Sequence, residues 1–466
     1  MASAKDTYPP DTPGRYSPVD DDLEAAGARS DQETAAEGLA WARPAKRRRW
    51  DWRTGVVGLG LGVLLGAGAF HAGGKLRTDG SAKDLDEAVF LESSSSLVTL
   101  NASDLRSVPV RIHYRNEPGL NQRSPILHPD CPVPVVYTSD ENAADVVVLN
   151  TDSSQSMSPE ELAERNKQRP WQKHAAWGVE SAPNRQSLEA HFKKLAAGKR
   201  NETAEYTLTY RLNSTVPATY SYDYFRYDNP PIPRKEKRSD KIAAAFISNC
   251  HPRNARTLIL EELIRLLPDK IDSFGSCRNN ADADSVLREM DLYDSVGQHN
   301  RWNQKITLIN YYPFTIAFEN SNDLDYVTEK YFQALERGTV PLVYGPPDYA
   351  RRFFPSPNAG IDVAAYLPPS YLAPSNSSSS GPEELDEEAK AGVARLAKRL
   401  ELLTSEEGAD EYESMLEWKK DDKWRRDPDN PLGKIVRLST SQWSQDCKLA
   451  GVYRGEEWAK NTWTEP

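Results

Sequence analysis

The sequence predicts an α/β protein whose strands lie in parallel sheets covered by helices. Three observations lead to this fold class. The first is a complete β-α-β unit, in which an apolar strand at 315–318 is followed by an amphipathic helix and a second apolar strand at 340–344. The second is the alternation of β-branched apolar runs with helix-like segments from residue 106 onward. The third is the length of 466 residues, which is enough for two domains of ordinary size.

The first 74 residues differ from the rest of the chain. Residues 1–53 are rich in Pro, Asp, Glu, Ala and Ser without an apolar face, so they are predicted to be a disordered cytosolic tail. Residues 54–74 carry no charge and are just long enough to cross a bilayer, which predicts a signal-anchor transmembrane segment. The basic run Lys46–Arg49 precedes this segment, so the positive-inside rule leaves residues 75–466 in the lumen. The alternative is a Gly-rich linker after a nuclear-localisation-like run.

Composition and short motifs limit which partners the chain is expected to bind. A net charge of −11 argues against binding to nucleic acid. Gly58, Gly62 and Gly66 lie four residues apart, a spacing typical of anchors that pair into a homodimer, although so Gly-rich a segment also produces it by chance. Four sequences for N-glycosylation agree with a lumenal body, and their acceptors are Asn101, Asn201, Asn213 and Asn376.

The four cysteines show no Cys-x-x-Cys spacing, which argues against a structural zinc site. An even number of cysteines on the lumenal side permits two disulfides. The sequence leaves the pairing open among Cys131, Cys250, Cys277 and Cys447.

The lumenal part is expected to contain a stem and two α/β domains. Residues 75–105 are polar and form the predicted stem. Residues 106–235 form the first domain, with predicted strands at 108–114, 133–137, 145–150 and 174–179 and helices at 158–167 and 186–195. Residues 236–466 form the second domain, with predicted strands at 241–247 and 271–274, helices at 255–267 and 383–403, and a polar insertion at 279–305.

The β-α-β unit carries the strongest signal of function. Its first strand ends in the polar turn Glu319–Asp323, and its helix is predicted to begin near Asp325 and to end at Gly338. This turn lies at the carboxyl end of a strand, where doubly wound sheets bind ligands. Backbone N–H groups at a helix start attract phosphate, and Lys330 adds a cation there.

The ordered motifs Phe318–Ser321, Asp325–Lys330, Val340–Pro341 and Gly345–Pro347 resemble the signature of the α1,3-fucosyltransferases. That family moves L-fucose from GDP-fucose to O3 of N-acetylglucosamine. The resemblance covers roughly residues 130–365, with a weaker echo at Tyr412–Lys419, and is closest to the plant-type core glycoprotein 3-alpha-L-fucosyltransferases.

The resemblance implies the GT-B fold, in which two Rossmann-like domains face each other, here behind the N-terminal membrane anchor. The first domain would take the acceptor and the second would bind GDP-fucose. It also implies a single-pass type II protein of the Golgi membrane with a lumenal catalytic part.

Donor-binding roles follow from the same resemblance for Ser248, Asn249, Arg256, Glu319, Asn320, Tyr326, Glu329 and Lys330. Arg256 and Lys330 would meet the charge that develops on the departing diphosphate, with Arg253 as the competing arginine. Glu329 and Tyr326 would contact the nucleotide sugar. Glu319 and Asn320 serve equally well to build the turn.

Glu180, within Trp177–Pro183, is the candidate catalytic base that takes a proton from the acceptor hydroxyl in an inverting transfer. His174 and His251 are alternative bases, and the donor-side position of His251 argues against it. On the acceptor side the resemblance offers Tyr210 and Arg211 as candidates. Asn213 stands where the family pattern has Asp, so no role is carried to that position.

Two Asp-x-Asp triplets, Asp282–Asp284 and Asp323–Asp325, match a motif that binds a divalent metal in other glycosyltransferases. The first lies in the polar insertion, and the second starts a helix already provided with cations. Both are interpreted as structural, so the sequence predicts no metal site and no cofactor besides the donor substrate GDP-fucose.

The expected acceptor is an N-glycan on a glycoprotein, at the glycan core. One alternative is transfer to outer-chain N-acetylglucosamine. Another is a catalytically silent glycan-binding homologue in the Golgi, which the presence of Glu180, Arg256 and Lys330 disfavours.

Overall fold

The computed structural model describes residues 89–93, 96–100, 107–122, 131–151, 157–199, 202–296, 300–378, 380–439 and 444–464. The predicted tail and transmembrane segment lie outside the described residues, as do Asn101 and Asn201. Within the described part, no helix combines the length and the apolar character that crossing a membrane requires. In the predicted stem, β1 (Val89–Ser93) and β2 (Ser96–Leu100) pair as an antiparallel hairpin.

The first of two five-stranded sheets is built from β3 (Val110–Arg115), β4 (Val135–Tyr137), β5 (Val146–Asn150), β6 (Lys173–Gly178) and β7 (Tyr206–Thr209). All its strand pairs are parallel, in the order β4-β3-β5-β6-β7. The first four strands confirm the predicted ones with small shifts at their ends, whereas β7 was not predicted. Helices α3 (Pro118–Asn121), α4 (Pro159–Gln168) and α5 (Gln186–Ala196) follow its strands.

The second sheet contains β8 (Ala243–Ala245), β9 (Ile271–Ser273), β10 (Phe314–Phe318), β11 (Val340–Tyr344) and β12 (Ile361–Asp362). Its strands are also all parallel, in the order β12-β11-β10-β8-β9. Counted along the chain, both sheets therefore have the strand order 2-1-3-4-5. The strand order reverses between β3 and β5 in one sheet and between β8 and β10 in the other, and such points bind ligands at the carboxyl edge of doubly wound sheets.

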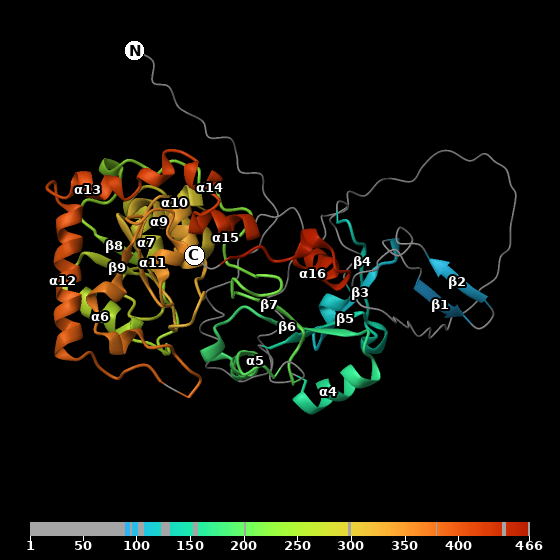
Figure 1. Cartoon of the computed structure of the whole chain (residues 1–466). Helices are drawn as coiled ribbons and strands as arrows, with labels where there is room; N and C mark the ends of the chain where they lie inside the picture. Colours follow the sequence, from blue (N-terminus) through green and yellow to red (C-terminus); the bar gives the residue numbers. More distant parts are fainter. Residues whose placement is uncertain are drawn as a thin grey trace, which may run out of the picture.

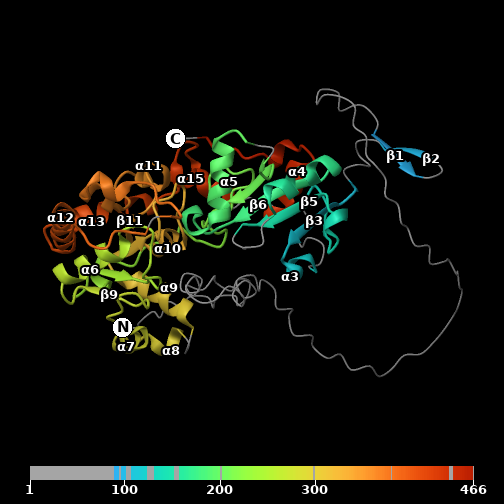
Figure 2. The same ribbon diagram turned by 90° about the horizontal axis from the view of Figure 1, so that it is seen from below.

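Helices cover both faces of the second sheet (Figures 1 and 2). On one face, α6 (Arg256–Leu266) and α12 (Glu387–Thr404) pack against Phe314 and Ile316 of β10. On the other face, α9 (Arg301–Tyr311) packs against Ala244 and α10 (Glu329–Arg337) against Ala317. The remaining helices are α7 (Ala283–Glu289), α8 (Tyr293–Val296), α11 (Tyr349–Phe353), α13 (Ala409–Ser414), α14 (Lys423–Arg426), α15 (Pro431–Ser439) and α16 (Gln445–Tyr453).

The predicted polar insertion at 279–305 is largely helical. It contains α7, α8 and the start of α9, and it buries Val286 and Leu287 in a core with Leu308 and Ile309. The high density of charged residues concealed these apolar positions, which recur at helical spacing.

The C-terminal helix α16 returns to the first sheet (Figure 1). Leu449 and Ala450 join the core formed by β3 and β5, and Asp446 accepts hydrogen bonds from the phenols of Tyr114 and Tyr137 at 2.5 and 2.6 Å. The predicted domain 236–466 therefore does not hold for α16, which shares the core of the first sheet. A disulfide between Cys131 and Cys447 links α16 to the segment before β4, and a second disulfide joins Cys250 to Cys277.

Candidate functional site

The β-α-β unit has the predicted strands, but its helix begins four residues later than expected. Thr328 is the residue before α10, whereas Asp325 has a left-handed backbone with φ of 63°. The Asp325 carboxylate is buried and accepts hydrogen bonds from the Arg352 guanidinium at 2.8 and 2.6 Å and from the N–H of Leu212 at 3.0 Å. The prediction of a helix cap at Asp325 was wrong because this carboxylate makes a tertiary ion pair instead.

Glu319 fixes Thr328, the residue that precedes α10. Its carboxylate is fully buried and accepts hydrogen bonds from the N–H of Thr328 at 2.7 Å and from the Thr328 hydroxyl at 2.9 Å. A Cβ at Gly345 would lie 2.8 Å from Cβ of Glu319, so only glycine permits this approach. Of the two roles considered for Glu319, turn structure agrees with its burial. At the other end of α10, Gly338 adopts the left-handed conformation predicted for it.

Glu180 lies where the two sheets meet, two residues beyond β6. Its Oε1 atom accepts hydrogen bonds from the Tyr326 phenol at 2.9 Å and from the Asn320 amide at 3.4 Å. The structure thus brings the candidate base into contact with two residues of the predicted donor-side signature, Tyr326 and Asn320. Tyr326 is itself almost fully buried, in edge-on contact with Tyr210 at 5.1 Å between ring centroids.

Tyr210 and Arg211 lie in a buried junction rather than on an open acceptor surface. The hydroxyl of Tyr210 and the guanidinium of Arg211 both bind the Asp323 carboxylate, which also accepts from the N–H of Ala182 at 3.2 Å. Burial raises the pKa of Tyr210 and that of Asp323. With Tyr210 only 1 % exposed, the predicted acceptor contact does not agree with its environment, and the residue instead holds the two sheets together.

Arg256 is the first residue of α6 and is completely buried. Its guanidinium donates to the carbonyl oxygen of Asn249 at 2.9 Å and to that of Phe318 at 3.3 Å. These carbonyls follow β8 and end β10, so Arg256 fastens the two strands at the point where strand order reverses. The environment fits a structural cation better than the predicted contact with phosphate.

Arg253 occupies the more open position. It is half-buried, and its guanidinium donates to the Asn184 side chain at 3.3 Å and to the Ser377 carbonyl at 3.1 Å. Its backbone N–H donates to the carbonyl of Asn320 at 2.7 Å. Of the two arginines considered from the sequence, Arg253 is the one that lies beside Glu180 and the signature turn.

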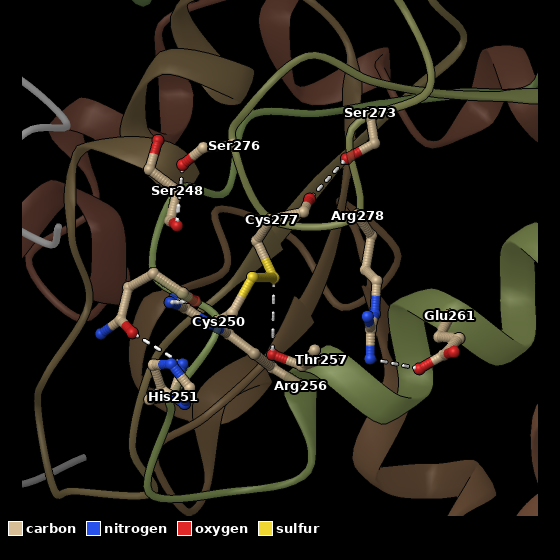
Figure 3. The surroundings of a disulfide bond; sticks show 11 residues. Ser248, Cys250, His251, Arg256, Thr257, Glu261, Ser273, Ser276, Cys277 and Arg278 are labelled. Carbon is tan, nitrogen blue, oxygen red and sulfur yellow. Dashed lines mark hydrogen bonds and ion pairs between the residues drawn. A yellow bond between two sulfur atoms is a disulfide. The ribbon is translucent and has the colours of Figure 1, made fainter.

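The segment Ser248–His251 follows β8 and surrounds a disulfide beside Arg256 (Figure 3). The Ser276 hydroxyl donates to the carbonyl of Ser248 at 3.0 Å, and the side chain of Asn249 accepts from the N–H of His251 at 2.7 Å. The Cys250–Cys277 disulfide ties this segment to the chain that follows β9, beside Arg256. Ser248 and Asn249 are therefore held by backbone hydrogen bonds on both sides of this disulfide.

The two histidines considered as bases are placed unlike Glu180. His174 is fully buried within β6, and burial lowers its pKa to about 4. His251 is exposed in the segment that follows β8. Neither shares a described hydrogen bond with the signature turn.

Glu329 and Lys330 begin α10, and Lys305, which was not among the predicted site residues, lies beside them. Lys330 is almost fully buried, with its ammonium 3.3 Å from the Glu329 carboxylate and 3.2 Å from the Thr328 hydroxyl. Lys305, at the end of the supposed polar insertion, brings a second buried ammonium to 3.8 Å from Glu329. Its position one residue before the apolar pattern of α9 was the signal that could have revealed it.

The remaining predicted positions lie away from this junction. Asn213 and Asn376 are exposed. Asp282 caps α7 by accepting from the N–H of Ser285 at 2.9 Å, and Asp284 accepts from the Gln304 amide. All four carboxylates of the two Asp-x-Asp triplets are thus engaged in structural contacts. The described ranges hold no group of three or more His, Cys, Asp or Glu side chains arranged for a metal ion.

Comparison with known proteins agrees with the resemblance seen in the motifs. Residues 235–375 match the model of the family described as glycosyltransferase family 10 (fucosyltransferase) C-term. The chain is 34% identical over 197 residues to a putative fucosyltransferase-like protein of Arabidopsis thaliana, covering 41% of this chain and 34% of that protein. It is 31% identical over 176 residues to GDP-fucose protein O-fucosyltransferase 3 of Canis lupus familiaris, covering 36% and 35%.

A third relative is glycoprotein 3-alpha-L-fucosyltransferase A of Drosophila melanogaster, 32% identical over 161 residues that cover 32% of this chain and 28% of that protein. The chain thus spans about a third of the length of these curated relatives. Among solved structures, an α1,3-fucosyltransferase with GDP-fucose matches with a TM-score of 0.33 at 16% identity, covering 70% of this chain and 83% of the other.

Proposed function

We propose that this chain, whose residues 235–375 carry the C-terminal domain of glycosyltransferase family 10, transfers L-fucose from GDP-fucose to an acceptor hydroxyl. The product we propose is an α1,3 linkage to N-acetylglucosamine of a glycoprotein N-glycan, at the glycan core. The observation that carries the proposal is the hydrogen bond between Tyr326 and Glu180, which places a carboxylate from the first sheet against the signature of the second. A transfer between two substrates requires such a meeting of acceptor-side and donor-side groups.

The proposed reaction is a single inverting displacement. The acceptor oxygen attacks C1 of fucose from the face opposite GDP, and the bond between C1 and the β-phosphate oxygen breaks through an oxocarbenium-like transition state. The proton of the acceptor hydroxyl passes to Glu180, and the bonding electrons leave with GDP. Oε1 of Glu180 is occupied by hydrogen bonds, whereas no described residue donates to Oε2, so Oε2 is the atom that receives the proton.

We place the diphosphate at the carboxyl edge between β8 and β10. Arg253 and Lys330 are the cations that lie beside this edge, from the loop after β8 and the start of α10. Fixed positive groups there stabilise the charge that develops on the leaving phosphate. Arg256 does not contact the diphosphate in this proposal. It holds the end of β10 and the segment after β8 together.

Several classes of acceptor can be tested against one another. The relatives include one named glycoprotein 3-alpha-L-fucosyltransferase A and another named GDP-fucose protein O-fucosyltransferase 3. Outer-chain N-acetylglucosamine is a further acceptor, and a silent glycan-binding homologue would transfer nothing. The full-length chain should therefore be incubated with GDP-fucose and three acceptors, namely core N-glycans, outer-chain N-glycans and folded Ser/Thr-containing protein domains. Linkage analysis should find fucose on O3 of core N-acetylglucosamine; fucose on a protein hydroxyl alone would contradict the N-glycan acceptor.

The wider architecture belongs to the same proposal. The two doubly wound sheets are the two halves of a GT-B enzyme, and residues 54–74 anchor it in the Golgi membrane as a single-pass type II protein with residues 75–466 in the lumen. The apolar span and its basic flank support this topology. Protease added to sealed microsomes should then remove only the N-terminal tail, and digestion of the body would contradict the topology.

A further inference from the structure

We infer that Asn184 is a positioning residue that couples the base Glu180 to Arg253 across the junction of the two sheets. The inference rests on the proposed transfer reaction, in which Glu180 takes the acceptor proton. Asn184 lies four residues after Glu180, at the end of the short 3-10 turn Ala182–Asn184. Its backbone N–H donates to the carbonyl of Ser181 at 2.9 Å, which fixes the turn.

The side chain of Asn184 reaches both partners at once. Its Nδ2 donates to Oε1 of Glu180 at 3.2 Å and to the Ser181 hydroxyl at 3.0 Å. Its Oδ1 accepts from Nε of Arg253 at 3.3 Å. A carboxylate can only accept and a guanidinium can only donate, so the two ends of the amide have one possible orientation here. A primary amide is the side-chain group that meets both demands at this spacing.

These contacts determine which carboxylate oxygen can act as a base. Oε1 of Glu180 collects four donors, from the N–H of Ser181 at 2.7 Å, Tyr326 at 2.9 Å, Asn184 at 3.2 Å and Asn320 at 3.4 Å. Oε2 receives no hydrogen bond from the part of the chain that the structure describes. Asn184 therefore helps to hold the carboxylate in a rotation that presents Oε2 to the acceptor.

Arg253 links the same amide to the donor side. Its backbone N–H is bound to the carbonyl of Asn320, and its guanidinium also donates to the carbonyl of Ser377. Loss of the Asn184 oxygen removes one of the contacts that orient this guanidinium beside the diphosphate. Asn184 thus contributes to base orientation through its nitrogen and to donor binding through its oxygen.

Two substitutions separate these contributions. Asn184→Asp keeps an oxygen for Arg253 but replaces the donor to Glu180 with a like charge, whereas Asn184→Ala removes both contacts. We expect kcat to fall about 10- to 100-fold in both variants, because small displacements of a reacting group are costly. The Kd for GDP, measured by calorimetry, should stay within about twofold of wild type in Asn184→Asp and weaken by about three- to tenfold in Asn184→Ala.

A double mutant distinguishes positioning from a general structural effect. If Asn184 acts through Glu180, then Glu180→Gln with Asn184→Asp should turn over no more slowly than Glu180→Gln alone, because residues that act as a unit are non-additive. Asn358→Asp, an exposed asparagine whose amide binds Ser414, is the matched control and should keep wild-type kcat. All variants should first be shown to keep the wild-type melting temperature within a few degrees.

The outcomes separate this inference from the proposed function. A wild-type chain that transfers no fucose would defeat the proposed function, and the base-positioning role of Asn184 with it. An active wild type together with Asn184→Asp at wild-type kcat would overturn the inference alone. Additive losses in the double mutant would also overturn it, because they would show that Asn184 acts independently of Glu180.

Discussion

The phenol of Tyr326 donates a hydrogen bond to the carboxylate of Glu180 across 2.9 Å, joining residues 146 positions apart. Tyr326 belongs to the signature before α10, and Glu180 follows β6 of the other sheet. This contact joins the carboxyl edges of the two sheets. It does so at the proposed catalytic base and at a residue of the donor-side signature. Asp323, three residues before Tyr326, also joins the two sheets, because its carboxylate binds Tyr210 and Arg211.

Replacing Asp323 with alanine should destabilise the protein by about 3–5 kcal/mol, because it leaves the buried phenol of Tyr210 and the half-buried guanidinium of Arg211 without their shared acceptor. Asp429→Ala removes a carboxylate that is 91% exposed and should change the free energy of unfolding by less than about 0.5 kcal/mol. Urea unfolding of both variants measures the difference. Equal, small effects would mean that the buried junction contributes little to stability.

The stability should also fall in mild acid because of His174. Burial, aided by the charges of Arg165 and Arg115, lowers its pKa to about 4 from an ordinary value of 6.5. Between these two pH values the unfolded chain binds a proton at this site that the folded chain does not, so the free energy of unfolding decreases as pH falls. The variant His174→Phe should lose less stability between pH 7 and 4.5 than wild type, by about 1–3 kcal/mol.

The exposed His251 provides the control for this measurement, and His251→Phe should keep the wild-type pH dependence of unfolding. Identical acid slopes for wild type and His174→Phe would show that the buried imidazole takes up its proton equally well in the folded and unfolded chains.

Lys330→Ala should weaken both GDP-fucose binding and turnover. Its ammonium lies at the start of α10, where it would meet phosphate in the ground state and in the transition state alike. Loss of a charge-assisted hydrogen bond predicts about a 10- to 100-fold effect on Kd. Lys390→Ala, at a side chain that is 43% exposed on α12, is the control and should bind GDP as wild type does. Unchanged affinity in Lys330→Ala would remove this lysine from the donor site.

Transfer should proceed without an added divalent metal, because Arg253, Lys330 and a helix N-terminus offer positive charge to the diphosphate. The initial rate in excess EDTA should stay within about twofold of the untreated rate, since no step of the proposed displacement is assigned to a metal. Activity that EDTA abolishes and manganese restores would contradict this prediction and would make the Asp-x-Asp triplets candidate metal ligands.

The sequence predicted what local patterns determine and missed what distant contacts determine. Strands β10 and β11 and the end of α10 at Gly338 were predicted correctly, because apolar runs and a left-handed glycine are local signals. The start of α10 was predicted wrongly, because Asp325 pairs with Arg352, 27 residues away. The return of α16 to the first sheet brings together Cys131 and Cys447, which are 316 residues apart, and no local pattern encodes such a contact.

The candidate site divides in the same way. Motif resemblance selected Glu180 and Tyr326, and the structure brings them into contact. Resemblance favoured Arg256 over Arg253 within one short motif, whereas the structure buries Arg256 completely and leaves Arg253 half-buried. Lys305 and Asn184 were missed, since their relevance comes from neighbours on other segments.

The most direct test of the account is the turnover of Glu180→Gln with GDP-fucose and a core N-glycan acceptor. The substitution keeps the size of the side chain and removes its basicity, so kcat should fall about 10²- to 10⁴-fold. The Kd for GDP should remain close to that of wild type, because the diphosphate lies at the edge of the other sheet. Near-normal turnover in Glu180→Gln would contradict the account, because another group would then have to take the acceptor proton.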